Sequence, residues 1–292
     1  MDTAGERRER TRCAGALPGA RVHARSLKAG LLLGPLMLVA GLASPARAGA
    51  WTEAQGHGQV ILQASASTAG QEFGPSHELL TSRPFEKAEV TLVFEYGLTD
   101  WLTLIAAPQF LAVQLGDPFP SSYAGPGYTD LGARMRLFQG EGTVVSAQVV
   151  ARLPGTGNSQ SAAAVGYEDA ELDLRVLFGA SFALFGKPSF LDVEVAQRQR
   201  FGPPPDEFRL DATLGVRVAP RWQLLLQSFN VISEGAGEGP YFDTSYEYYK
   251  LQAGVAYDWT RDLTLICAVV GTYFARNAPQ ENGVVMSALY RF

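Results

Sequence analysis

The chain has 292 residues, of which 47% are hydrophobic and 18% charged, and its formal net charge is −5 at pH 7. An acidic balance argues against nucleic acid as a partner, because phosphate binding depends on clustered Lys and Arg. The only cysteines are Cys13 and Cys267. They give no disulfide framework, and the sequence indicates no metal site and no cofactor.

The first 48 residues have the order of a secretory signal. Seven basic residues in 1–28 precede an uncharged stretch at 29–43 and the triplet Ala46-Arg47-Ala48. This order predicts a signal peptide at 1–48, cleaved after Ala48, and a mature protein at 49–292. An uncleaved anchor is the less favoured alternative, because the apolar stretch has 15 residues and includes Pro35.

Removal of the leader changes the charge and the cysteine content. The leader holds 8 of the 24 basic residues and 3 of the 29 acidic ones, so the mature net charge is −10. Cys267 is then alone. The mature sequence has no apolar run of about 18 residues, which argues against a membrane-spanning helix.

Segments of alternating apolar and polar residues recur from end to end of the mature chain, at the length of a tilted strand that crosses a bilayer. The predicted strands are 58–67, 88–96, 102–114, 128–138, 143–153, 170–182, 190–200, 208–218, 223–232, 246–257, 263–274 and 282–292. Alternation is clear in 128–138, 208–218 and 246–257. It is poor in 102–114, 223–232 and 263–274, so ten or fourteen strands are also compatible with the sequence.

The last ten residues form an alternating strand that ends on an aromatic. Val284, Met286, Ala288, Tyr290 and Phe292 share one face. This ending resembles the closing strand of bacterial outer-membrane β-barrels, and the resemblance implies recognition by the barrel-assembly machinery.

The predicted connections alternate between short and long. The short ones are 97–101, 139–142, 183–189, 219–222 and 258–262. The long ones are 68–87, 115–127, 154–169, 201–207, 233–245 and 275–281. Short turns at one end and long loops at the other are typical of outer-membrane barrels. We therefore expect an all-β fold, a single transmembrane antiparallel up-and-down barrel of about twelve strands, with lipid and lipopolysaccharide around it.

Aromatic residues mark one rim of this barrel. Indole rings favour the membrane interface, and all four tryptophans map to the short-turn end. The predicted interface aromatics are Trp51, Trp101, Trp222, Trp259 and Phe292.

If the apolar faces meet lipid, the charged faces of four strands line a lumen. The predicted lumen-lining residues are Asp130, Arg134, Arg136, Glu171, Asp173, Arg175, Asp192, Glu194, Arg198, Arg209, Asp211 and Arg217. Six acids and six bases favour an ion-pair ladder that braces the wall. A constriction that selects permeants is the alternative, although balanced signs argue against strong ion selectivity.

Three segments resemble a known family. The turn and strand at 97–104 (GLTDWLTL), the strand start at 127–134 (GYTDLGAR) and the segment 152–157 (RLPGTG) are similar to motifs of outer-membrane channels named for meta-pathway phenol degradation. The third has an additional Gly155. The resemblance implies a barrel that passes small, often apolar or aromatic, compounds, and it assigns no functional residues.

The sequence therefore predicts a passive outer-membrane channel whose permeant it does not identify. One rival is a plugged, structural or surface-binding barrel. An outer-membrane hydrolase is less favoured, because His57 and His77 are the only mature histidines and neither has a paired nucleophile and acid. A soluble secreted barrel is the last alternative, since period two alone does not say which face is outside.

Overall fold

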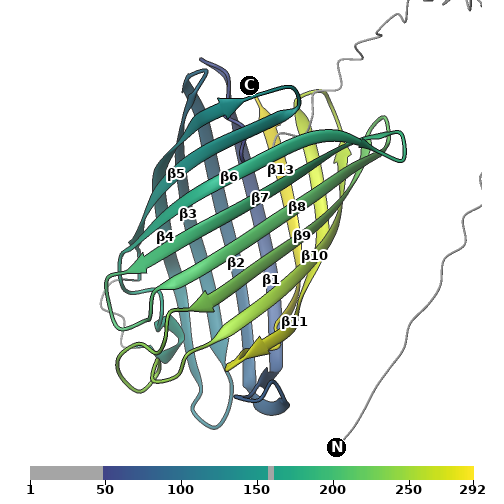
Figure 1. Cartoon of the computed structure of the whole chain (residues 1–292). Coiled ribbons are helices and arrows are strands. Elements are labelled where there is room, and N and C mark those ends of the chain that lie inside the picture. The colour runs from purple at the N-terminus through teal and green to yellow at the C-terminus, as the bar shows by residue number, and fades with distance from the viewer. Residues whose placement is uncertain (1–48, 157–160) are drawn as a thin grey trace, which may run out of the picture. The chain divides into compact units, whose positions relative to one another are not determined.

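In the computed structural model, twelve long antiparallel strands form one closed barrel (Figure 1). The structure describes residues 49–156 and 161–292. The strands are β1 (Gly58–Phe73), β2 (Leu79–Thr99), β3 (Leu102–Leu115), β4 (Ser121–Gln139), β5 (Thr143–Pro154), β6 (Glu171–Leu184), β7 (Lys187–Arg200), β8 (Glu207–Ala219), β9 (Trp222–Ser233), β10 (Glu247–Asp258), β11 (Leu263–Arg276) and β13 (Asn282–Arg291). A two-residue strand, β12 (Ala278–Pro279), pairs with the end of β1.

Each strand pairs with its neighbours in sequence, and β1 closes the ring. It pairs with β2 along one edge and with β13 along the other, where Gln59 lies opposite Arg291 and Thr68 opposite Asn282. At the seam, the Gly58 and Phe292 backbones exchange two hydrogen bonds of 3.0 Å. The predicted transmembrane barrel and its strand count are therefore confirmed.

The turns on one rim are short, as predicted, but two of the predicted long loops are mostly strand. β1 and β2 stay paired out to Phe73 and Leu79, and β3 and β4 out to Leu115 and Ser121. The sequence lost its alternation there because hairpins that leave the bilayer have water on their outer face. In these two hairpins the alternating stretch marks the part of each strand that contacts lipid, and strand pairing continues beyond that stretch.

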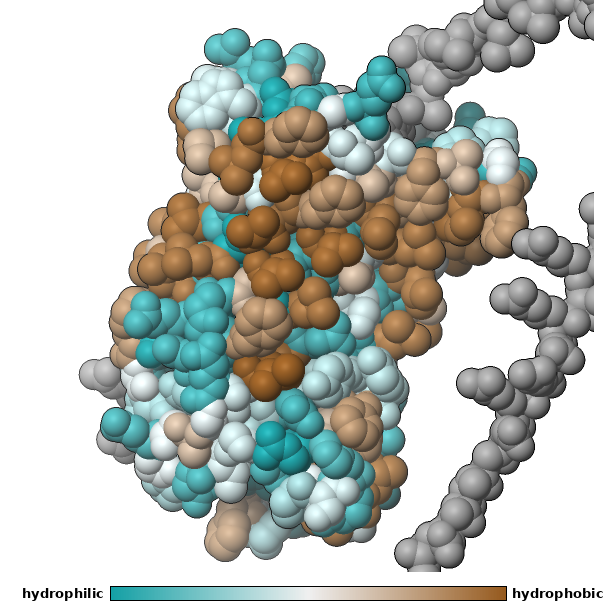
Figure 2. Space-filling view, in the orientation of Figure 1, coloured by the Kyte–Doolittle hydropathy of each residue, from teal (hydrophilic) through white to brown (hydrophobic). Residues whose placement is uncertain are grey.

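The outer wall carries an apolar belt. Leu210, Leu251 and Val176 are 40%, 44% and 57% exposed, while Asp173 on the inner face is 2% exposed. Apolar side chains gather on the part of the wall nearer the short turns, and hydrophilic ones lie toward the long connections (Figure 2). A soluble barrel would place its apolar face inside, so that alternative is wrong. Within the described ranges, no helix is long and apolar enough to cross a bilayer.

Candidate functional site: the barrel interior

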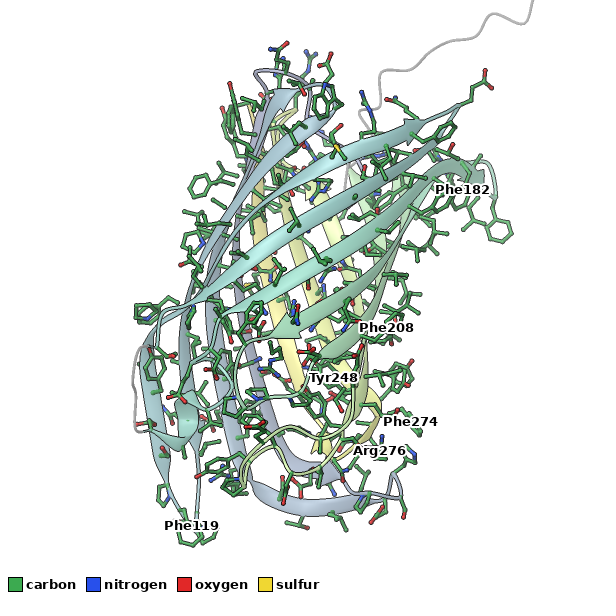
Figure 3. All side chains as sticks on the ribbon, turned by 60° about the vertical axis from the view of Figure 1, so that its left-hand side comes forward. Phe119, Phe182, Phe208, Tyr248, Phe274 and Arg276 are labelled. Carbon is green, nitrogen blue, oxygen red and sulfur yellow. The ribbon has the colours of Figure 1, made fainter. Side chains whose placement is uncertain are left out.

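The strand register puts all twelve predicted lumen residues on the inner face. Asp173 lies between Val150 and Arg198, and Glu194 between Leu177 and Asp211, with side chains of paired residues on one side of the sheet. Residues of the other parity point outward: Phe182 projects from the barrel, as does Phe119 at the tip of the β3–β4 turn (Figure 3). That these twelve residues line a passage stays a prediction.

Arg175 is the centre of the ion-pair network. Its guanidinium contacts Asp173 at 2.6 Å, Glu194 at 2.5 Å and Asp211 at 3.0 Å. These groups come from three adjacent strands, β6, β7 and β8, and the Arg175 side chain is 13% exposed. One cation therefore holds three carboxylates on this part of the wall.

A second cluster lies toward the long connections. Glu171 contacts Arg152 at 2.9 Å and Arg200 at 2.8 Å, and Arg198 contacts Asp173 at 2.9 Å. Glu207 extends the cluster and pairs with Arg209 at 3.0 Å. The network runs from β4 to β8, and this half of the inner wall is consequently filled with mutually neutralised charge.

Several of these partners were not among the predicted residues. Arg152, Arg200 and Glu207 lie at inward positions of β5, β7 and β8, and Glu95 on β2 pairs with Arg134 at 2.7 Å. Parity within strands 88–96 and 143–153 could have identified Glu95 and Arg152. Arg200 and Glu207 were harder to assign because Arg200 ends the predicted strand 190–200 and Glu207 lies in the predicted connection 201–207.

Four predicted lumen residues stand apart from the network, namely Arg134, which pairs with Glu95 on β2, Asp192, which accepts from the Ala50 N–H, and Arg136 and Arg217. Arg217 pairs with Asp258 at 2.7 Å near the short turns. Arg136 is half-buried, and its backbone N–H donates to the Trp101 carbonyl at 2.8 Å. None of the four joins the β4–β8 cluster.

The segment 49–57 runs along the inner wall at the short-turn end, and we call it the strap. The Ala50 N–H donates to Asp192 Oδ2 at 2.7 Å, Ser146 Oγ donates to the Ala50 carbonyl, and Arg134 Nη1 donates to the Trp51 carbonyl at 3.0 Å. Further along, Glu53 N donates to Thr103 Oγ1 at 2.8 Å. The strap thus passes from β7 to β1.

The prediction that Trp51 is an interface aromatic is wrong. Its ring packs edge-on to Phe190 at 6.2 Å between centroids and against the buried residues Val144 and Leu177, all on the inner face. The strap carries the indole into the barrel. Trp101, Trp222, Trp259 and Phe292 are about half exposed or more; their place at a lipid interface stays a prediction.

The turn of the GLTDWLTL segment holds the strap. Asp100 accepts hydrogen bonds from Thr52 Oγ1 at 2.8 Å and from Gln55 N at 3.0 Å. A β-carbon at Gly97 would lie 2.1 Å from the Ala54 carbonyl oxygen, so only glycine allows this close backbone approach. The motif glycine and aspartate therefore have a structural role here.

A loop folds into the opposite end of the barrel. In the connection from β5 to β6, the 3₁₀ turn η1 (Ala162–Ala164) packs Ala163 against Leu111 and Val113 on the inner face of β3. The Tyr128 hydroxyl lies 3.1 Å from the carbonyls of Gly166 and Asp169. We call residues 161–170 the inward loop, which packs against inner residues of β2, β3 and β4.

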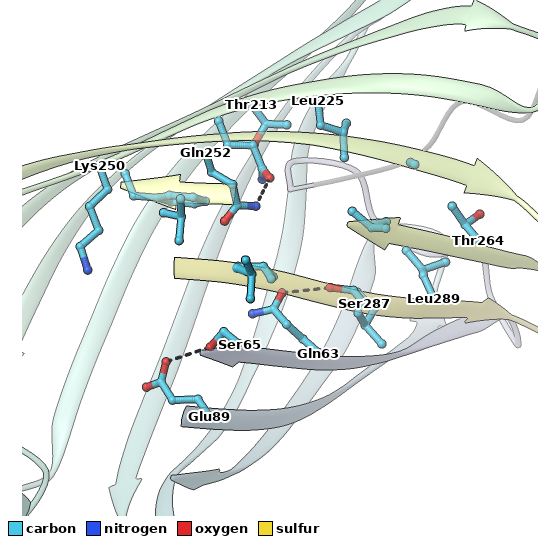
Figure 4. Close-up of a pocket in the computed structure, with 18 of the residues that line it drawn as sticks. Gln63, Ser65, Glu89, Thr213, Leu225, Lys250, Gln252, Thr264, Ser287 and Leu289 are labelled. Atoms are coloured by element: carbon cyan, nitrogen blue, oxygen red, sulfur yellow. Dashed lines mark hydrogen bonds between the residues drawn. The ribbon is translucent and has the colours of Figure 1, made fainter. Parts of the chain in front are cut away.

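A cavity of about 430 Å³ lies against the other half of the wall, with Gly49 of the strap in its lining (Figure 4). Its polar lining is mostly neutral. Gln252 donates to Gln227 at 2.7 Å, and Gln227 donates to Thr213 Oγ1 at 3.2 Å. Aliphatic side chains such as Leu225 and Leu289 lie among these groups. The cavity wall is therefore amphipathic and different from the charged half.

A compact charged cluster forms part of the cavity lining on the side of the long connections. Glu281, just before β13, pairs with Lys87 at 3.5 Å, with Lys250, and with the Ser67 hydroxyl. Burial opposes ionisation of the Glu281 carboxyl, but the two ammonium groups outweigh it and lower its pKa to about 2. Glu281 is thus an anion between two cations.

The two histidines occupy unrelated places. His57 Nδ1 lies 3.2 Å from the Phe292 carbonyl at the seam. His77 stacks on Phe274 at 4.4 Å and hydrogen-bonds the Ala275 carbonyl. No group of three or more His, Cys, Asp or Glu side chains is placed to hold a metal ion within 49–156 and 161–292.

Comparison with solved structures identifies the fold. An outer membrane channel from Pseudomonas putida F1 superposes with a TM-score of 0.65 at 18% identity, over 84% of this chain and 99% of that chain. The chain has the fold of an outer-membrane channel. Two other solved structures are less similar, each with a TM-score of 0.46. They are the NanC porin (8% identity, over 78% of this chain and 98% of that one) and the translocator domain of the autotransporter NalP from Neisseria meningitidis (10% identity, over 82% and 90%). No family model and no curated protein matches the chain.

Proposed function

We propose that the chain is a passive channel in the bacterial outer membrane, exported after cleavage behind Ala48. It would pass small solutes along the half of the lumen formed by β1, β2, β9, β10, β11 and β13. The observation that carries the proposal is the division of the inner wall. Fixed ion pairs occupy β4 to β8, while the opposite half leaves a cavity of about 430 Å³, within the size range of small-molecule sites.

The lining favours uncharged solutes. Amide and hydroxyl groups can exchange hydrogen bonds with a permeant without the cost of separating an ion pair, and the aliphatic groups among them accept apolar parts. The charged half supports this choice indirectly, because most of its carboxylates and guanidinium groups already neutralise one another. We therefore assign a bracing role to the predicted lumen residues of β4 to β8 that are ion-paired.

A substitution pair on β9 tests this path. Gln227 faces the cavity, and its neighbour Leu226 is 46% exposed on the outer wall. We expect Gln227→Trp to lower single-channel conductance and the swelling of proteoliposomes in uncharged solutes several-fold, because the indole fills the cavity. Leu226→Trp adds the same side chain on the lipid side and should change neither. Equal effects of the two substitutions would contradict the proposed path.

A plugged barrel is the second candidate, and a specific observation favours it: the strap and the inward loop both fold into the lumen. Wild-type protein without conductance and without solute swelling would support the plug and reject the channel. Contacts with lipopolysaccharide, and recognition of Phe292 by the assembly machinery, belong to this proposal whichever candidate holds.

A further inference from the structure

The start of the strap lies directly against a buried carboxylate. The Ala50 N–H donates to Asp192 Oδ2 at 2.7 Å, and Asp192 is 2% exposed. A β-carbon at Gly49 would lie 2.0 Å from Asp192 Oδ1 and 2.4 Å from Oδ2. The backbone of Gly49 is therefore in contact with both oxygens of this carboxylate.

Two features of this position require glycine at Gly49. Its φ is +65°, in the region that favours glycine. In addition, any side chain at this position would collide with Asp192. The chain thus turns at Gly49 with its backbone, rather than a side chain, presented to the carboxylate.

The surroundings of Asp192 contain more acid than base. Glu194 stands two residues along β7 on the same face, and Asp211 faces Glu194 from β8. Of the nearby cations, Arg175 already holds three carboxylates and Arg134 pairs with Glu95. Among the described residues, Asp192 has no ion-pair partner. A buried carboxylate in this setting calls for one more positive charge.

We propose that the Asp192 carboxylate is the binding site for the α-ammonium group of the mature chain. The inference depends on the export and cleavage proposed above, because cleavage after Ala48 turns the Gly49 nitrogen into a cation. That cation would lie beside the carboxylate that the Ala50 N–H already contacts, and would satisfy it with a charge-assisted hydrogen bond. Docking of the new terminus would then fix the strap against the inner wall, so that processing completes the interior of the barrel.

The properties of the terminal amine itself provide the test. Mass spectrometry first establishes the N-terminal residue of the mature protein. Trace acetylation of the folded protein at a series of pH values then gives the pKa and reactivity of that amine. A free α-amino group has a pKa of about 7.7–8.0. We expect a pKa at least about one unit higher, which is about a tenfold preference for the protonated form, and labelling slower than in the unfolded chain.

Asp192→Asn should return the amine to its ordinary pKa and speed its labelling, because the shape is kept and the charge is lost. Asp258→Asn removes an inward carboxylate three strands away, on β10, and should leave the amine as in the wild type. If Asp192→Asn does not fold, Gly49→Ala replaces it: the charges remain, but the added methyl group displaces the terminus and weakens protection.

An ordinary pKa with unprotected labelling in the wild type would overturn the inference, and so would a mature chain that begins at another residue. A different first residue would also contradict the proposed cleavage behind Ala48. Neither outcome affects the proposed passage of solutes, which conductance measures separately. Wild-type protein that shows no conductance, but whose terminal amine is protected and has a raised pKa, would reject the channel and support the docking site.

Discussion

Arg175 shows how a single side chain can organise the interior of a barrel. It holds Asp173, Glu194 and Asp211, which lie on three strands, and its side chain is largely buried. Charges so enclosed are costly when a partner is removed. The ladder therefore ties β6, β7 and β8 together beyond their backbone hydrogen bonds.

We expect Arg175→Met to destabilise the barrel by about 3–5 kcal/mol, because three carboxylates lose their shared cation inside the wall. Denaturant unfolding in lipid vesicles measures the change. Adding Asp211→Asn to Arg175→Met should recover part of the loss, since one uncompensated charge is removed. An Arg175→Met barrel as stable as the wild type would show that water screens these groups.

The inward positions of charged residues were predictable from strand parity, but their partners were not. Parity fixes which face a residue occupies, whereas pairing depends on the register between strands. Arg134 illustrates the limit: its inward face was predicted, yet besides Gln148 on β5 its partners are Glu95 on β2 and the Trp51 carbonyl of the strap. Trp51 itself was misplaced because periodicity carries no information about a segment that lies outside the strands.

At the scale of elements, the connection between β5 and β6 differs most from a simple surface loop. It was predicted as a long connection, and its inward fold depends on contacts far away in sequence, with Leu111, Val113 and Tyr128. The Tyr128 hydroxyl is placed to donate to the Gly166 or the Asp169 carbonyl, and the residue is 3% exposed. Tyr128 is therefore one polar anchor of the loop, beside the Ser161 hydroxyl and the Arg200 guanidinium.

Tyr128→Phe should loosen this loop while keeping the ring in place, because only the hydroxyl is lost. The expected results are faster cleavage by a glutamate-specific protease after Glu168 and higher conductance. Tyr123→Phe on the same strand is the matched control, since the Tyr123 hydroxyl donates to Pro126 within its own strand. Equal behaviour of both variants would mean that the Tyr128 hydroxyl does not hold the loop.

For the whole molecule, the fold was predictable because lipid requires an apolar outer face and paired backbone groups. Most of the strands show this requirement as alternation, although 102–114, 223–232 and 263–274 show it poorly. Where the constraint ends, prediction weakens: β1 and β2 continue beyond the alternating stretch, and the strap and inward loop follow no period. The architecture could thus be predicted from the sequence, whereas the strap and the inward loop that occupy the lumen could not.

Cys267 gives a direct test of membrane embedding, since it is exposed on the outer wall of β11. A polarity-sensitive maleimide on Cys267 should emit at shorter wavelength after reconstitution and be quenched by brominated lipid, because the label lies in hydrocarbon. The control combines Cys267→Ser with Ser76→Cys, which moves the label to the exposed β1–β2 turn. Identical spectra at the two sites would contradict the assigned outer face.

The double pairing of β1 sets the order in which the molecule can be completed. Until residues 282–291 arrive, the growing ribbon has two open edges, at β1 and β11, each with a row of unsatisfied peptide groups. A polypeptide that lacks these residues would keep both edges open and could pair through them with another copy. Residues 282–291 thus protect two edges at once, and both stay open to wrong partners until this strand has paired.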